Sequence, residues 1–220
     1  MSESRVETEQ SMREAFDAGH FETVAHVALA TYGQEILNFM TLRLRARDDA
    51  QEAFSMFAED LWRGLPDFGW RCSMRTWAYT LARNAATRYG KAPQQARARN
   101  IPLSRPGVLS ELIERVRSAT HRYQRTRVKD RFRELREKLD PEAQILLVLR
   151  VDRGLSWRDL AMTMSGDVDL DDETLERESA RLRKAFERVK IELKRMAEDE
   201  GLLNSHTGGS SASLPRAGKE

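Results

Sequence analysis

The sequence predicts an all-α protein built from two small helical domains that a basic flexible linker joins. Apolar residues recur every three to four positions over long stretches, which is typical of amphipathic helices. No alternating apolar and polar stretch is long enough to predict a strand. Hydrophobic residues make up 40% and charged residues 33% of the 220-residue chain. This composition suffices for two small cores but not for one large core.

The expected domain boundaries follow the helix-breaking residues. We assign residues 1–15 to a flexible N-terminus, 16–90 to the first domain and 91–132 to the linker. The first part of the linker holds several prolines, which favour extended backbone. The second domain covers 133–200, and a tail rich in Gly and Ser, expected to be disordered, covers 201–220.

Three helices are expected in the first domain. Helical apolar stripes run from Phe21 to Met40 and from Ala50 to Trp62. Glycines and a proline within 64–69 predict a loop after the second stripe. Ser73 is a suitable N-cap for a third helix that reaches about Tyr89.

Three more helices are expected in the second domain, and their predicted ranges are 141–153, 156–164 and 172–199. Asp140 followed by Pro141 is typical of a helix start. Ser156, with an aspartate three residues later, comes close to a capping box. A glycine follows each of the three ranges and can end the helix in a left-handed conformation.

The last predicted helix has one apolar face and one basic face. At about 100° per residue, Leu175, Leu182 and Val189 form a narrow apolar stripe. The cations on the opposite side are Arg177, Arg181, Lys184 and Arg188. A short helix followed by a longer basic one is the plan of a helix-turn-helix, whose second helix enters the major groove of DNA. A solvated face with salt-bridging partners is the alternative interpretation of these cations.

An acidic run precedes that basic face. Residues 167–178 hold seven Asp or Glu and one Arg. Acids near a helix N-terminus are favoured by the helix dipole but repel phosphate, so we expect this helix to meet DNA with its middle. The spacing of the first aspartates resembles a calcium loop, but Asp172 stands where such a loop needs glycine, and we therefore do not expect calcium here.

A basic block lies in the middle of the chain, although the net charge is only +2. Residues 71–99 hold seven Lys or Arg and no acid. Within the block, Arg75, Tyr79 and Arg83 recur every four residues and should form the outer face of a helix, opposite Trp77. Rings interleaved with arginines suit single-stranded nucleic acid, because bases stack on rings while cations follow phosphates.

The loop before that helix extends the same pattern with Phe68, Trp70 and Arg71. Packing at a tight helix junction is the competing interpretation of the aromatic residues. We prefer the packing interpretation for Trp77, and Trp70 fits either role equally well.

Several classes of function are disfavoured. No apolar run could span a membrane and the N-terminus has no signal peptide, so we expect a cytoplasmic protein without membrane insertion. Cys72 is the sole cysteine and the four histidines are scattered, which argues against a disulfide or a structural zinc site. We expect no catalytic residues, no metal and no other cofactor, and we favour an inert thiol over a redox role for Cys72.

Two parts of the chain resemble the extracytoplasmic-function sigma factors of bacterial RNA polymerase. The residues that resemble region 2 of that family are Asp48, Gln51, Glu52, Phe54, Leu61, Trp62 and the run from Thr76 to Asn84. The segments that resemble region 4 are Leu155 to Ala161 and Arg181 to Ala185. The region 2 resemblance is the more specific, because several residue types recur at fixed spacing over nearly forty positions.

The resemblance implies a promoter-specificity subunit that binds core RNA polymerase and promoter DNA and is not an enzyme. The polymerase-binding residues would be Asp48, Gln51 and Glu52, with Phe54 packed inward. The residues that recognise and melt the −10 element would be Phe68, Trp70, Arg71, Arg75, Tyr79, Arg83 and Asn84. The residues around the −35 element would be Arg177, Ser179, Arg181, Lys184 and Arg188. By the helical wheel Asn84 and Ser179 face the packing sides, so we rank them below the arginines.

The chain departs from the family pattern in its acidic run and in Ala78 and Tyr79, where the family favours larger aliphatic residues. An anti-sigma factor is a further partner that the resemblance leaves open. Three alternatives remain. A free-standing helix-turn-helix regulator would bind duplex DNA without polymerase, and a metal-dependent enzyme would need converging carboxylates. A helical adaptor would leave the basic block unexplained.

Overall fold

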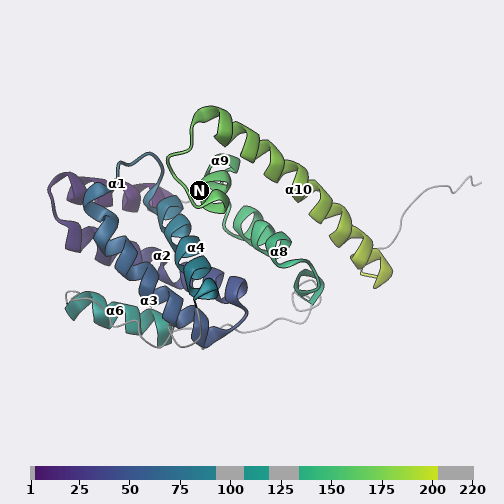
Figure 1. The fold of residues 1–220 in the computed structure, drawn as a ribbon, viewed down its shortest axis with the longest axis horizontal. Helices are drawn as coiled ribbons and strands as arrows, with labels where there is room; N and C mark the ends of the chain where they lie inside the picture. The colour runs from purple at the N-terminus through teal and green to yellow at the C-terminus, as the bar shows by residue number, and fades with distance from the viewer. Residues whose placement is uncertain (1–2, 93–106, 119–133, 203–220) are drawn as a thin grey trace, which may run out of the picture.

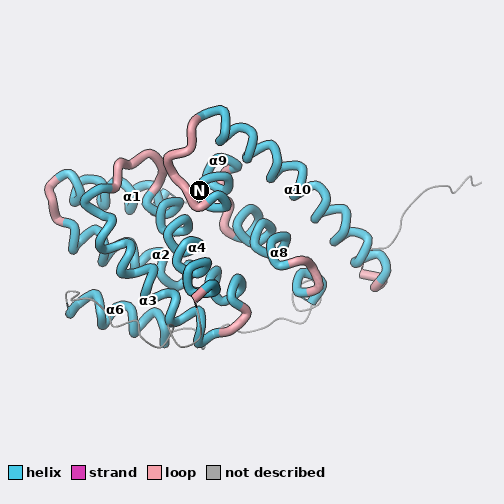
Figure 2. Tube along the Cα trace, viewed as in Figure 1, coloured by secondary structure: helices cyan, strands magenta, loops and turns pink. Residues whose placement is uncertain are grey.

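The computed structural model describes residues 3–92, 107–118 and 134–202 of the chain. These residues form helices and the connections between them, and none of them forms a strand (Figure 2). The predicted all-α class is therefore confirmed for the described part of the chain. None of the helices in these three ranges combines the length and the apolar character that a bilayer crossing requires.

Three helices enclose most of the core: α2 (Phe21–Leu44), α3 (Arg47–Gly64) and α4 (Met74–Lys91). Each of the three packs against the other two. They match the three helices that apolar periodicity predicts for the first domain. Ser73 is the N-cap of α4, where its hydroxyl accepts a hydrogen bond from the Thr76 amide at 3.1 Å. Between α3 and α4 the chain makes one 3₁₀ turn, η1 (Leu65–Asp67), before an irregular loop.

Large side chains fill the space between these helices. The rings of Phe54 and Phe57 are fully buried and lie 5.4 Å apart. Two glycines allow close approach: a Cβ on Gly33 would lie 3.1 Å from Val116, and a Cβ on Gly64 would lie 3.0 Å from the Trp77 ring. Burial of several complete aromatic side chains makes this region the main source of hydrophobic stabilisation.

The N-terminal segment differs from the expected flexible segment 1–15. Residues Glu3–Asp17 form helix α1, which packs on α2, and Met12 is 1% exposed. The Glu9 carboxylate accepts hydrogen bonds from the backbone amides of Met74 (2.8 Å) and Arg75 (3.1 Å) at the start of α4. An anion at the positive end of a helix dipole is stabilising, so α1 also caps α4 from a distant part of the sequence.

The expected linker, 91–132, contains a further helix. Helix α6 (Gly107–Ser118) lies along α2 and buries Leu112, Ile113 and Val116. Leu109, Leu112, Ile113 and Val116 stand at i, i+3, i+4 and i+7, so this helix had a local signal, which the prolines before it outweighed in the linker prediction. The rest of the linker lies outside the described residues, as does nearly all of the tail 201–220.

The C-terminal helices follow the prediction closely. Helix α8 (Pro141–Leu147) continues into one π-helical turn, η3 (Val148–Asp152), and is followed by α9 (Trp157–Ser165) and α10 (Asp172–Asp199). Ser156 and Asp159 form a complete capping box, and Gly166 ends α9 at φ 84°. The apolar stripe of α10 is confirmed, since Leu175, Leu182 and Val189 are buried.

The C-terminal helices lie against the N-terminal ones (Figure 1). Helix α9 packs on α4, and α8 packs on α2. Buried residues from both groups, such as Ala82 and Leu160, belong to one continuous cluster. The division into two domains therefore stays a prediction, because the two groups of helices share a core here.

Candidate nucleic-acid interface

The face of α4 that carries Arg75 and Tyr79 is covered on both sides. Tyr79 is completely buried and meets Phe39 of α2 edge to face, with ring centroids 5.4 Å apart. Arg75 is 7% exposed, and its guanidinium lies 5.6 Å from the Tyr79 ring centroid. The expectation that these two residues form an outer face is wrong in this structure. Helix α2 on one side and the segment before α9 on the other exclude solvent from them.

Arg75 is held by a carboxylate that sequence reasoning missed. Its Nε and Nη2 donate to the two oxygens of Glu35 at 2.6 and 3.0 Å, and Nη1 donates to the carbonyl oxygen of Arg153 at 2.9 Å. Burial disfavours the charged guanidinium, but hydrogen bonding and Coulomb attraction from Glu35 outweigh it, so the pKa of Arg75 is raised. Glu35 is one of only two acids on α2, and at about 100° per residue it falls within the stripe of Ala28, Tyr32 and Phe39. An acid within an apolar stripe was the signal that could have found it.

Further along, α4 makes a row of hydrogen bonds with the segment that contains α9. Thr76 Oγ1 donates to Asp159 Oδ1 at 2.9 Å, and Asn84 Nδ2 donates to the carbonyl oxygen of Gly166 at 2.8 Å. Arg83 lies between them along α4 and donates to the Ser165 carbonyl oxygen at 3.4 Å. Sequence reasoning named Arg83 and Asn84 as DNA contacts, and the structure places both against their own chain.

The aromatic loop before α4 forms a compact cluster. Phe68 is buried and stacks on Trp77, with centroids 4.4 Å apart, which confirms the packing role preferred for Trp77. The assignment of Phe68 to DNA contact is corrected, because its ring is enclosed in the core. Trp70 has a left-handed φ of 54° and lies edge-on to Phe16 of α1. A bulky residue at positive φ is strained and persists only where its surroundings hold it. Arg71 is exposed and pairs with Asp169 at 2.6 Å.

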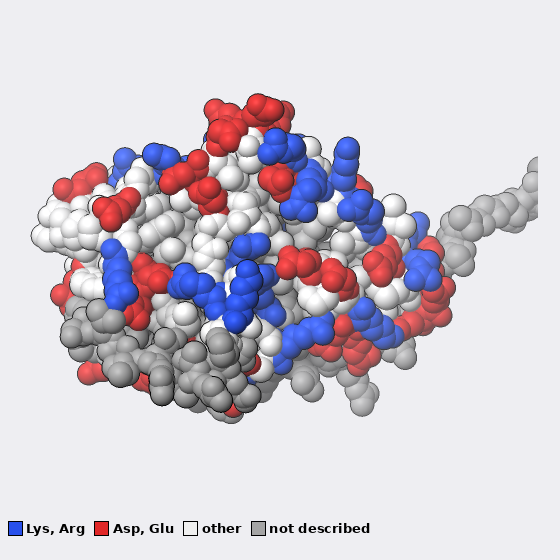
Figure 3. Space-filling model, in the orientation of Figure 1, with Lys and Arg blue, Asp and Glu red and all other residues white. Residues whose placement is uncertain are grey.

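The basic face of α10 is open to solvent, as the helical wheel predicts. Its cations Arg177, Arg181, Lys184 and Arg188 are all exposed. In Figure 3 acidic side chains gather over the start of α10 and basic ones over its following turns. Ser179 is the exception among the predicted −35 residues: it is buried and donates to the Trp157 carbonyl oxygen at 3.2 Å. The assignment of Ser179 to DNA contact is corrected accordingly, because it joins α10 to α9.

The acidic run serves the local backbone. Asp171 is the N-cap of α10 and accepts from the Thr174 amide at 2.8 Å, which lowers the pKa of Asp171. Asp167 accepts from the Asp169 amide at 2.8 Å. Among the residues that the structure describes, no three His, Cys, Asp or Glu side chains gather to hold a metal ion.

The three predicted polymerase-binding residues lie at the start of α3. Asp48 and Glu52 are exposed, and Gln51 is partly buried. Arg117 of α6 reaches this position: its Nη2 lies 3.3 Å from Glu52, and its carbonyl oxygen accepts from Gln51 Nε2 at 3.4 Å. Phe54 points into the core and is fully buried, as predicted.

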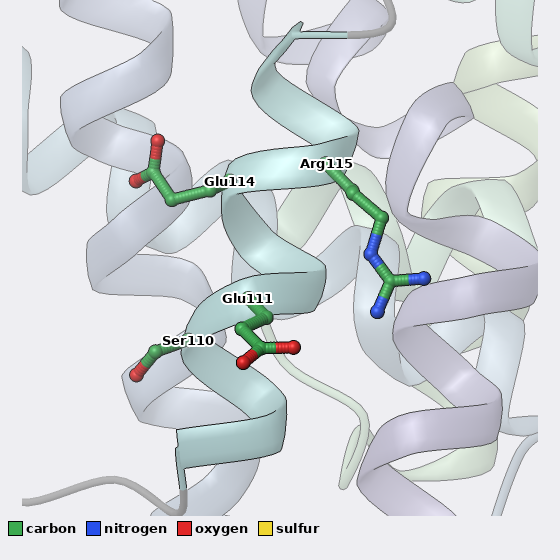
Figure 4. Close-up of a pocket in the computed structure, with 4 residues that line it drawn as sticks. All are labelled: Ser110, Glu111, Glu114 and Arg115. Atoms are coloured by element: carbon green, nitrogen blue, oxygen red, sulfur yellow. The ribbon is translucent and has the colours of Figure 1, made fainter.

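The surface of the described residues includes the two hollows below. One, of about 410 Å³, lies where α1, α4 and the start of α9 meet, and Glu9, Trp70, Cys72 and Asp159 are among its lining residues. The other is an open depression on α6, lined by Ser110, Glu111, Glu114 and Arg115 (Figure 4). In Figure 4 Glu114 and Arg115 leave α6 in opposite directions, so these side chains do not converge on a common ligand.

We predict that the Cys72 thiol reacts slowly. Burial, followed by the nearby carboxylate of Asp159, raises the pKa of Cys72 from 9.0 to about 12. Since the thiolate is the nucleophile, alkylation by iodoacetamide at about pH 8 should be roughly 10³-fold slower than for the same thiol in urea-unfolded chain. In the unfolded chain the thiol ionises near pH 9, well below the pKa of the folded chain. The free energy of unfolding therefore has its full value below about pH 9 and falls as the pH rises toward 12. Equal alkylation rates in the folded and unfolded chain would contradict this assignment.

The chain has no match among known proteins in three comparisons. No family model matches it, and neither a curated protein nor a solved structure is similar enough to count as a match.

Proposed function

We propose that this chain is a sigma-type specificity subunit, which binds core bacterial RNA polymerase and directs it to promoters. One arrangement carries the proposal. The exposed basic face of α10 follows a short, capped α9, in a chain whose α3 also presents the exposed carboxylates of Asp48 and Glu52. The first feature suits duplex DNA, and the second suits a protein partner. Together with the region 2 resemblance of residues 16–90, they favour a protein that joins polymerase to DNA.

In this proposal α10 provides the −35 contacts. Arg181, Lys184 and Arg188 recur along one exposed face, where guanidinium and ammonium groups can reach phosphates and the O6 and N7 acceptors of guanine. The acids at the start of α10 keep its first turn away from phosphate, so the middle turns dock. The buried Leu175 stripe packs α10 against α9 and α8.

The −10 contacts would come from the loop 64–72 and from α4. Arg71, Arg83 and Asn84 supply donors, and Trp70 supplies a ring on which an unstacked base can lie. In this role the chain acts by binding and carries out no catalytic step. The binding energy from these groups favours the melted promoter over the duplex. Residues 16–90 and 133–200 would act as the two domains, joined by residues 91–132.

Gel filtration with bacterial core RNA polymerase tests the partner. The native chain should co-elute with core enzyme, and the variant Gln51→Ala with Glu52→Ala should co-elute about tenfold less well, because it loses two polar groups from the α3 contact. Gln10→Ala with Glu14→Ala, which removes an exposed Gln and Glu from α1, is the matched control and should behave like the native chain. Absence of co-elution by the native chain at low salt would overturn the proposal.

A free-standing helix-turn-helix regulator is the second candidate, favoured by the α9–α10 pair considered alone. Such a regulator would bind one palindromic duplex tightly without polymerase. Selection of duplexes from a random library by the native chain alone separates the two. A palindromic consensus would favour the regulator, and weak binding without a consensus would favour the specificity subunit.

A further inference from the structure

The surface of α4 and of the loop before it, which would meet the −10 element, is occupied by another part of the same chain. Four side chains of α4 and one of the loop donate hydrogen bonds to acceptors within residues 153–169. The donors are Arg71, Arg75, Thr76, Arg83 and Asn84. Four of these five were predicted to contact DNA. The fifth, Thr76, follows Arg75 on α4.

The groups that they meet are all oxygen acceptors. Asp159 and Asp169 offer carboxylates, while Arg153, Ser165 and Gly166 offer backbone carbonyl oxygens. Two of these carbonyls lie at the C-terminal end of α9, which is the negative end of its dipole. The segment therefore presents to α4 the chemistry that phosphate and base oxygens would present.

From this complementarity we propose that residues 153–169 are an intramolecular competitor of single-stranded DNA and hold the chain in a closed, autoinhibited state. This inference rests on the proposed function, because it assigns α4 to the −10 element. DNA binding then requires α9 to leave α4. The apparent affinity for DNA is then the affinity of the open state multiplied by the fraction of molecules that are open.

The contact is close enough for a single methyl group to disturb it. Gly166 has a φ of 84°, and a Cβ there would overlap Asn84 Oδ1 and lie 2.9 Å from Arg83 Nη1. Gly154 also has a positive φ, 69°, but a Cβ there would have nothing within 4 Å. Gly166→Ala and Gly154→Ala share the backbone strain of alanine at positive φ, and only the first places a methyl group against the Asn84 and Arg83 side chains, where it should weaken the contact between α9 and α4.

A charge pair gives a second, independent variant. Asp169 pairs across the interface with Arg71, whereas Asp172 pairs with Arg158 at 3.1 Å within the C-terminal helices. Asp169→Lys and Asp172→Lys change the net charge of the chain equally, so both alter non-specific attraction to DNA to the same extent. Only Asp169→Lys replaces attraction by repulsion across the closed contact.

The experiment measures opening and DNA binding on the full-length chain without polymerase. Small-angle X-ray scattering gives the radius of gyration, and fluorescence anisotropy gives the affinity for a labelled oligothymidine of about 20 nucleotides. We expect Gly166→Ala to raise the radius and to bind the strand about tenfold more tightly than Gly154→Ala. Asp169→Lys should exceed Asp172→Lys by roughly fivefold, in the range of one exposed ion pair.

Two results would overturn the inference. The first is a variant with a larger radius of gyration whose DNA affinity equals that of its control. The second is that neither Gly166→Ala nor Asp169→Lys differs from its control in radius of gyration or in DNA affinity. If Gly166→Ala does not fold, the lysine pair decides alone. Co-elution with core polymerase depends on α3 and not on Gly166, so a failure here is distinguishable from a failure of the proposed function.

Discussion

Glu35→Gln should lower the free energy of unfolding by about 3 kcal/mol, the lower end of the cost of breaking a buried ion pair. The carboxylate accepts two hydrogen bonds from Arg75 and also lies 3.7 Å from Arg153. Its side chain is 14% exposed and that of Arg75 is 9% exposed, so water cannot replace the lost charge. Urea unfolding followed by tryptophan fluorescence measures the change.

The control for this prediction is Glu114→Gln. Glu114 pairs with Arg117 at 2.9 Å but is 70% exposed, so the same chemical change should cost less than about 1 kcal/mol. Equal losses in the two variants would contradict the importance of burial at Glu35. Glu35→Leu combined with Arg75→Met should recover part of the loss, because it removes both buried charges together.

Phe54→Ala should cost about 3–5 kcal/mol of stability, the usual range for a fully buried aromatic side chain. The ring is 0% exposed, lies against Phe57, and approaches the surface of α2 at Gly33. Because α2, α3 and α4 all pack together here, neighbouring side chains have little freedom to fill the cavity. Thermal unfolding by circular dichroism gives the change in Tm, and urea unfolding gives the energy.

Phe186→Ala removes the same atoms from a partly buried position on α10, where the ring contacts Trp157 edge to face at 5.6 Å. It should cost less than half as much as Phe54→Ala. A larger loss at Phe186 than at Phe54 would mean that the core lies nearer to α10 than the structure places it.

Local signals predicted the helices well. Ser73, Ser156 and Gly166 mark helix ends through caps that need only neighbouring residues, and each acts at its predicted place. The apolar stripe and the exposed cations of α10 follow from the geometry of one helix. These features depend on contacts a few residues apart, which a sequence displays directly.

Long-range packing could not be predicted in the same way. Arg75 and Tyr79 lie opposite Trp77 on a helical wheel, but both sides of α4 are covered by α2, α3 and α9. The wheel says which residues share a face and not how many faces are covered. Likewise nothing local indicates that Glu9 caps α4, although Met12 and Phe16 at helical spacing could have indicated that α1 is a helix.

In the proposed function, this chain gives RNA polymerase its choice of promoter. Transcription from total bacterial genomic DNA by purified core polymerase, with and without the chain, tests it when the 5′ ends of the transcripts are sequenced. We expect a defined set of start sites that appears only with the native chain. That set should be strongly reduced when Arg181, Lys184 and Arg188 are all changed to alanine, since these changes remove the proposed −35 contacts. Identical start sites with and without the chain would contradict the claim.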